Sequence, residues 1–180
     1  MTIKIAEGNL QTKFGEYHEI LFYDGQKESI ALIMGNVDGE EEVLCRIHSS
    51  CIAAHNFNST ECDCREQMEI AQRLIQQKGN GIIIWLDQEG KGNGHLALLK
   101  SKPFKDQGLS QSASYEAIGF KSDARDFTCA AEILHDVGIK SVCLITNNSD
   151  KVETLIQFGV KVAGIKETSL TQWRSANSGN

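Results

Sequence analysis

The sequence predicts a mixed α+β and α/β fold, in which N-terminal antiparallel strands precede β/α alternation around a mixed sheet. The first fifty residues are rich in β-branched and aromatic residues and contain turn signals. The second half alternates short apolar runs with stretches of helical periodicity. The length of 180 residues suits a single domain, which we expect at residues 1–168, before a polar C-terminal tail at 169–180.

The N-terminal region contains four segments with strand composition, "TIKIAEGNL", "FGEYHEILFYD", "SIALIMGNV" and "EVLCRIHS". The stretches "DGQ" and "DGEE" separate the later segments and are typical of turns. We therefore expect an antiparallel sheet here, with a mainly structural role.

A helix is predicted next, over "CDCREQMEIAQRLIQQKGNG", where the apolar residues recur at helical spacing and Gly79 or Gly81 ends the pattern. "GIIIWLD" has the continuous apolar character of a buried strand, and "QEGKGNG" follows it as a glycine-rich loop. The remaining elements are expected in this order: helical stretches at roughly 95–102 and 110–120, a helix in "ARDFTCAAEILHDVGI", a strand in "SVCLITNN", a helix with a Ser/Asp cap in "SDKVETLIQFG", and a last strand in "VKVAGI".

The composition narrows the range of partners. The formal net charge of −6 argues against nucleic acid as a bulk partner, but a few local cations would suffice for a small phosphorylated ligand. The chain begins without a run of signal-peptide type and contains no stretch of roughly 20 apolar residues. We therefore expect a cytoplasmic protein that does not bind a membrane.

Three of the six cysteines lie close together in "CIAAHNFNSTECDC", as Cys51, Cys62 and Cys64. Cytosolic thiols stay reduced, so this cluster favours a metal site or catalysis over a disulfide. Three thiolates are soft ligands that suit Zn²⁺. Three cysteines plus a water would make a catalytic site, and a fourth protein ligand would make a structural one.

The fourth ligand is left open by the sequence. His48, His55 or Cys45 could close the shell, and a cluster without metal is a further alternative. Cys45 lies in a strand pattern that is typical of the core. Cys129 and Cys143 lie on apolar faces, so we expect both in the core as well.

Three further segments could bind a ligand. The loop "DQEGKGNG" could bring backbone N–H groups to a phosphate or ring edge, although an ordinary turn explains it equally well. In "KSDARDF", Asp123 could cap a helix, or act as an acid/base carboxylate beside a phosphate-binding Arg125. "LITNNSDKV" places Thr146 at the end of a predicted parallel strand, where α/β proteins bind ligands, and Lys151 in the first turn of the helix that follows.

These segments, in this order, resemble the GTP cyclohydrolase II family over about residues 1–165. The strongest parts are "RIHSSC…FNSTECDCREQ", "DQEGKGNG", "KDQG", "IGFKSDARDFTCAAEIL" and "LITNNSDKVE". The resemblance implies the fold of that family and a zinc-dependent cyclic amidine hydrolase. Such an enzyme opens the imidazole ring of GTP and releases formate and pyrophosphate, the first step of riboflavin biosynthesis. It also implies one Zn²⁺ per chain, Mg²⁺ with the nucleotide triphosphate, and a homodimer.

The resemblance also implies roles for individual residues. Cys51, Cys62 and Cys64 match the zinc ligands, Arg125 matches the arginine that attacks the α-phosphorus, and Asp123 matches the general base. A water activated by the metal would attack C8 of the purine. The implied substrate-binding residues are Arg46, Ile47, His48, Ser49, Ser50, Gln67, Glu89, Gly90, Lys91, Lys102, Gln111, Thr146 and Lys151.

The chain departs from the family pattern at several of these positions. Ser50 replaces a glutamate, Lys91 an arginine, Gln111 a small hydroxyl residue, and Glu61 a residue that is usually basic. Lys102 replaces a tyrosine that is held to assist ring opening and formate release. Two alternatives follow. One is a diverged enzyme that acts on another nucleotide or on a non-nucleotide amidine or guanidine compound, or that stops at the formamidopyrimidine. The other is a non-catalytic, zinc-stabilised binding module.

Overall fold

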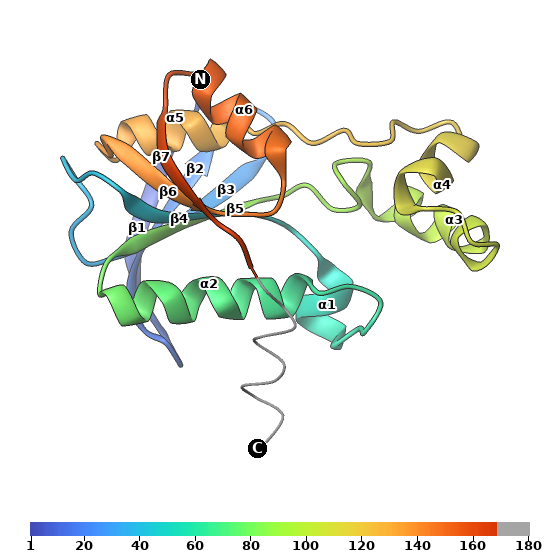
Figure 1. Cartoon of the computed structure of the whole chain (residues 1–180), viewed down its shortest axis with the longest axis horizontal. Helices are drawn as coiled ribbons and strands as arrows, with labels where there is room; N and C mark the ends of the chain where they lie inside the picture. Colours follow the sequence, from blue (N-terminus) through green and yellow to red (C-terminus); the bar gives the residue numbers. More distant parts are fainter. Residues whose placement is uncertain (169–180) are drawn as a thin grey trace.

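A computed structural model describes residues 1–168 of the chain, and Figure 1 shows their arrangement. The elements run in the order β1 (Ile3–Thr12), β2 (Gly15–Tyr23), β3 (Glu28–Met34), β4 (Val43–Ser49), α1 (Ile52–Phe57), α2 (Cys64–Lys78), β5 (Gly81–Leu86), α3 (Gly94–Asp106), α4 (Gln111–Ala117), α5 (Thr128–Asp136), β6 (Ser141–Ile145), α6 (Ser149–Gln157) and β7 (Lys161–Lys166).

The strands form a single mixed sheet in the order β1-β2-β3-β5-β4-β6-β7. β1, β2, β3 and β5 pair antiparallel, whereas β4 pairs parallel with β5 and β6, and β6 pairs parallel with β7. The predicted fold class is therefore confirmed. β4 departs from the antiparallel sheet expected for the first fifty residues, because β5 lies between it and β3.

Helices cover both faces of this sheet. In Figure 1, α1 and α2 lie on one face, and α5 and α6 lie on the other. The central strand β5 contributes to both cores, because successive side chains of a strand point to opposite faces. Ile82 and Ile84 pack in the larger core cluster with residues of α5, and Ile83 packs in the smaller one with Ala71 and Ile75 of α2.

The helices α3 and α4 lie beyond the edge of the layered body, and we call residues 94–117 the arm (Figure 1). Its buried side chains are Ala97 and Ser101 of α3 and Ser114 and Tyr115 of α4. Two chain segments join the arm to the body. One is the glycine-rich loop after β5, and the other leads from α4 to α5.

Most expected elements are present, with local differences. The helix over "CDCREQ" ends at Gly79, whose φ of +81° suits glycine at a helix C-terminus. The cap of α6 is Asn148, whose side chain accepts from the Asp150 N–H, and not the expected Ser/Asp pair. Helix α1 was not predicted, because six residues are too few to show helical periodicity.

Two further expectations concern the C-terminal tail and membrane-spanning segments. The tail expected at residues 169–180 lies outside the described residues. Within residues 1–168, no helix is both long enough and apolar enough to cross a membrane.

Candidate metal centre and anion site

The candidate site is built where three neighbouring parallel strands end. Ser50 and Cys51 follow β4, the glycine-rich loop follows β5, and Thr146 follows β6. The order β5-β4-β6 places these three ends side by side. The carboxyl ends of parallel strands are the usual ligand-binding edge of an α/β sheet.

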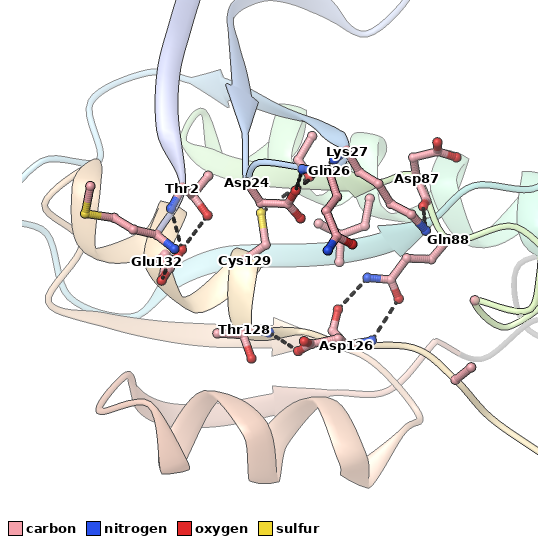
Figure 2. Close-up of a pocket in the computed structure, with 15 residues that line it drawn as sticks. Thr2, Asp24, Gln26, Lys27, Asp87, Gln88, Asp126, Thr128, Cys129 and Glu132 are labelled. Atoms are coloured by element: carbon pink, nitrogen blue, oxygen red, sulfur yellow. Dashed lines mark hydrogen bonds and ion pairs between the residues drawn. The ribbon is translucent and has the colours of Figure 1, made fainter. Parts of the chain in front are cut away.

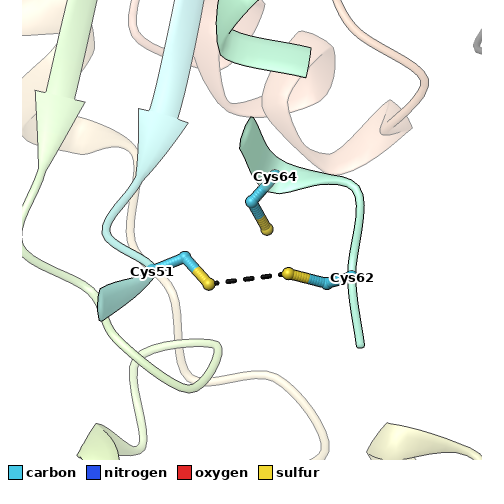
Figure 3. Close-up of side chains that lie close together, drawn as sticks. All are labelled: Cys51, Cys62 and Cys64. Atoms are coloured by element: carbon cyan, nitrogen blue, oxygen red, sulfur yellow. Dashed lines mark hydrogen bonds between the residues drawn. The ribbon is translucent and has the colours of Figure 1, made fainter. Parts of the chain in front are cut away.

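The three clustered cysteines converge. Figure 3 shows the side chains of Cys51, Cys62 and Cys64 pointing toward one another, and their sulfur atoms all lie within 4.8 Å of one another. The sulfur atoms of Cys51 and Cys62 are 3.6 Å apart. A tetrahedral ion with metal–sulfur bonds of about 2.3 Å holds its sulfur ligands about 3.8 Å apart, so the spacing fits such an ion.

The chemistry of the cluster also fits a cation. Burial, and then the neighbouring Cys62, raises the pKa of the Cys64 thiol, and burial raises the pKa of Cys51 as well. Three thiols held this close resist ionisation unless a positive charge offsets their repulsion. The donor set therefore fits a soft or borderline divalent ion.

None of the residues considered for a fourth ligand joins the cluster. Among residues 1–168, the only group of three or more potential ligands that converges is the cysteine triad. Cys45 is fully buried in the core, as its strand pattern predicted. His48 and His55 instead contact each other, with their Nε2 atoms 3.0 Å apart. This arrangement favours an open three-cysteine site.

Cys129 and Cys143 were also expected in the core. Both side chains are partly buried, and each packs against one of the two core clusters.

A polar network connects the cysteine segment to a buried arginine. The Asp63 carboxylate accepts a hydrogen bond of 2.9 Å from the Gln67 amide, and Gln67 Oε1 accepts from Arg46 Nη2. Arg46 Nη1 donates to the Ile145 carbonyl at 3.0 Å, but Arg46 Nε has no partner among the described residues. Arg46 is 4% exposed and binds no carboxylate among residues 1–168, so its charge is available to an anion.

A second buried cation lies close to Arg46. Lys151 is 5% exposed, and its ammonium donates to the Ile47 carbonyl at 2.8 Å. Burial, followed by repulsion from Arg46 and Arg125, lowers the pKa of Lys151 to about 7. Lys151 Nζ and Arg125 Cζ each lie 5.5 Å from the centre of the Phe127 ring, so both cations contact the same aromatic ring.

Asp123 holds Arg125 from one side. Its carboxylate accepts from Arg125 Nε at 2.9 Å and from Nη2 at 2.5 Å. Although partial burial opposes the effect, these hydrogen bonds lower the pKa of Asp123. Asp123 does not cap α5, so the capping interpretation is wrong. Nη1 of Arg125 has no partner among the described residues, because the bonds to Asp123 engage only Nε and Nη2.

The glycine-rich loop contacts the cysteine segment, the segment that contains Asp123, and the arm. The Glu89 carboxylate accepts from the N–H of Ile52, the residue that follows Cys51, at 2.8 Å. Lys91 has a φ of +55°, which is uncommon for a residue with a side chain. Its carbonyl accepts from the Ala124 N–H, and its ammonium donates to Ser112 of the arm at 2.9 Å.

The remaining predicted residues lie around this centre. On β4, Ile47 has its side chain in the core, and His48 is 2% exposed, so burial lowers the pKa of His48 to about 2 and keeps it neutral. The hydroxyl of Ser50 is 3.4 Å from the Asp87 carboxylate. The others are Ser49 at the end of β4, Gly90 in the loop, and Thr146, whose hydroxyl accepts from the Asn148 N–H.

Two predicted residues belong to the arm. Lys102 Nζ lies 2.9 Å from the Glu61 carboxylate, so an ion pair joins the arm to the residue before Cys62. Gln111 donates to the Ser101 hydroxyl at 2.9 Å and thereby connects α4 to α3. Both side chains are therefore engaged in contacts within the protein.

The sequence did not assign a role to Asp63 or Phe127. The signal for Asp63 was its position between two cysteines, where its carboxylate binds Gln67. Phe127 lies within the segment that was predicted to be helical, but it precedes α5, and its ring contacts two cations.

A polar cavity of about 400 Å³ adjoins the site but contains none of the predicted site residues (Figure 2). Asp24, Lys27, Asp126 and Glu132 line it, close to the first turn of α5.

Comparison with known proteins decides the family. The family model described as GTP cyclohydrolase II matches residues 3–167. The chain belongs to the GTP cyclohydrolase II family. It is 38% identical over 160 residues to GTP cyclohydrolase-2 of Histophilus somni, and the aligned region covers 88% of this chain and 74% of that protein. The identity is 37% over 161 residues to the enzyme of Actinobacillus succinogenes, with 88% and 74% covered.

Longer proteins also contain this domain. The riboflavin biosynthesis protein RibBA of Chlorobium phaeovibrioides is 35% identical over 161 residues, or 88% of this chain and 39% of that protein. A solved structure of RibBX, a two-domain 3,4-dihydroxy-2-butanone 4-phosphate synthase from A. baumannii, has a TM-score of 0.50 and 12% identity. The superposition covers 93% of this chain and 40% of that chain. At this low identity, the similarity supports the assignment of the fold and nothing about function. The predicted class of enzyme, a cyclic amidine hydrolase of GTP cyclohydrolase II type, is confirmed by family membership.

Proposed function

We propose that this protein is a zinc-dependent GTP cyclohydrolase II, which opens the imidazole ring of GTP and releases formate and pyrophosphate. The observation that carries the proposal is the convergence of three cysteine sulfur atoms beside the buried cations Arg46 and Lys151 at the ligand-binding edge of the sheet. A ring hydrolase needs an activated water, which a bound metal ion can supply, and a triphosphate needs cations. This edge carries candidate ligands for the metal and buried cations for the triphosphate.

The cysteine triad would hold the metal. When bound, a zinc ion supplies the Lewis acidity that makes water nucleophilic at neutral pH. Glu89 would fix the position of the metal ligands, because it binds the N–H of the residue that follows Cys51. One water opens the ring at C8 to give a formamide, and a second water hydrolyses that formamide to formate and an amine.

The cations would bind and cleave the triphosphate. Arg46 and Lys151 lie buried with only neutral partners, and an anion would relieve the cost of burying two positive charges. Arg125, oriented by Asp123, would present Nη1 to the α-phosphorus. As Nη1 gives up a proton, an N–P bond would form while the bond to the pyrophosphate oxygen breaks, and a water would then hydrolyse the N–P bond and restore the arginine. Asp123 stays ionised and would accept a proton as general base. Mg²⁺ on the triphosphate, a homodimer and a cytoplasmic location complete the proposal, and six free cysteines suit a reducing compartment.

A second candidate function is ring opening without release of formate. The ion pair between Lys102 and Glu61 favours it, because the Lys102 ammonium is already bound at the position where the resemblance implies a tyrosine. Another substrate, such as a different nucleotide or a non-nucleotide amidine or guanidine compound, is the further form of this candidate. Ser50 supports it, because its hydroxyl faces Asp87 where the family pattern has a glutamate.

The experiment is to incubate zinc-loaded protein with GTP and Mg²⁺, and to follow pyrophosphate and formate separately by mass spectrometry. Release of both products supports the first candidate, and pyrophosphate with a formylated pyrimidine supports the second. Arg125→Ala should abolish pyrophosphate release, whereas Arg73→Ala, on the exposed side of α2, should not. Unchanged GTP with folded, metal-loaded protein would refute GTP as the substrate.

A further inference from the structure

The hydroxyl of Tyr115 is an anomaly in the described part of the chain. The side chain is 0% exposed, yet its oxygen has no hydrogen-bond partner among residues 1–168. Buried tyrosine hydroxyls usually find a partner, because an unpaired one has lost its bonds to water and gained nothing in return. Such a group calls for an explanation, and a ligand that completes it is one.

Tyr115 lies against the glycine-rich loop of the candidate site. A Cβ atom built on Gly90 would lie 3.2 Å from the Tyr115 hydroxyl oxygen and 2.6 Å from the Gly94 carbonyl oxygen. The loop therefore approaches the hydroxyl as closely as it does because residue 90 has no side chain. On either side of Gly90 are Glu89 and Lys91, two of the residues implied in nucleotide binding.

The charges around Tyr115 belong to the site. Burial, followed by the nearby acidic groups of Glu89, Asp123 and Cys51, raises the pKa of the Tyr115 hydroxyl to about 12. At neutral pH the hydroxyl is therefore a hydrogen-bond donor without an acceptor. These three groups come from the glycine-rich loop, from the segment that orients Arg125 and from the cysteine cluster. The negative surroundings favour an uncharged acceptor over a phosphate.

The chain offers a matched comparison in Tyr17. Its side chain is also 0% exposed, its hydroxyl also lacks a partner among the described residues, and burial alone raises its pKa to about 12. Tyr17 packs with Ile75 and Ile83 in the smaller core cluster, beneath α2. An unpaired hydroxyl is thus not in itself a sign of function, and the location of Tyr115 is what distinguishes it.

We propose that Tyr115 is a further substrate-binding residue, whose hydroxyl donates a hydrogen bond to a ring nitrogen or carbonyl oxygen of the bound purine. The contact requires a shift of the loop at 88–94, because the hydroxyl is buried. Gly90, Gly92 and Gly94 all have positive φ values, and glycine gives such a segment access to alternative conformations. The inference deepens the proposed function and rests on it.

The test compares Tyr115→Phe with Tyr17→Phe in the full-length, zinc-loaded protein. Each substitution removes one unpaired oxygen, so the melting temperature of each ligand-free variant should stay the same or rise by about 2–4 °C. Only Tyr115→Phe should lower kcat/KM for GTP, by roughly tenfold, the loss expected for one hydrogen bond. The rise in melting temperature caused by GTP and Mg²⁺ should also shrink in Tyr115→Phe alone.

Three outcomes would overturn the inference. Wild-type kcat/KM and a wild-type GTP-induced shift in Tyr115→Phe would mean that the hydroxyl does not meet the substrate. A lower melting temperature of ligand-free Tyr115→Phe would mean that the hydroxyl already has a structural partner. A wild-type protein that neither binds nor converts GTP would overturn the proposed function and this inference with it, whereas the first two outcomes leave the proposed function intact.

Discussion

Lys151 should give the reaction a pH dependence of predictable sign. Its ammonium is 5% exposed, and burial, with repulsion from Arg46 and Arg125, lowers its pKa to about 7. Only the protonated form attracts an anion, so the apparent affinity for the nucleotide should fall as the pH rises above 7. One pH unit above the pKa, about a tenth of the lysine is protonated, so kcat/KM for GTP should be roughly tenfold below its acid plateau.

The assay is a kcat/KM profile between pH 6 and 9 for the wild type and for variants of this residue. Lys151→Arg should remove the alkaline limb, because arginine stays charged over the whole range. Lys151→Met should be slow at every pH. Lys161→Arg changes an exposed lysine on β7 and should leave the profile unchanged. A wild-type profile that is flat to pH 9 would refute the reasoning.

The same shift has a consequence for stability. The folded-state pKa of Lys151 lies below the unfolded value, so between about pH 7 and 10 the unfolded chain binds a proton that the folded chain does not. The contribution of Lys151 to the free energy of unfolding therefore rises with pH across this range. Lys151→Met should abolish that part of the pH dependence.

Three further predictions concern the metal, the arm and the loop. Cys64→Ala should lower the zinc content measured by mass spectrometry, as chelation does to the wild type, whereas Cys143→Ala should not. The exposed ion pair of Glu61 and Lys102 should contribute at most about 1 kcal/mol to holding the arm against the cysteine segment. Lys102→Glu replaces this attraction with repulsion and should weaken GTP turnover. Adding Glu61→Lys reverses the pair and should restore turnover at low salt. Gly92→Ala should abolish turnover, because its Cβ would lie 2.7 Å from Ala124 backbone atoms.

The sequence predicted those parts of the site that are encoded locally. Cys51, Cys62 and Cys64 are close in the chain, so their spacing alone indicated a metal site, and their convergence follows from a strand end meeting a helix start. Buried strands were visible as apolar runs because both faces of β5 are covered. The core position of Cys45 could be predicted for the same reason.

Contacts between distant segments could not be predicted from local patterns. β5 pairs with β3 and thereby lies between β3 and β4 in the sheet, although it follows both in the sequence. The hydrophobic periodicity of a strand does not indicate which strand it will pair with. The ion pair between Glu61 and Lys102 joins residues 41 positions apart, and neither residue indicates the other. His48 and His55 were candidate metal ligands because histidine commonly binds zinc, and only the fold shows that they contact each other.

The central claim is that the protein opens the purine ring at C8. The most direct test is to supply GTP carrying ¹³C at C8 to the zinc-loaded protein with Mg²⁺, and to follow the labelled carbon by NMR. The account predicts that the ring signal disappears and is replaced by a formyl signal, and then by formate if the second hydrolysis takes place. A label that stays at the ring position of GTP, with folded and metal-loaded protein, would contradict the account.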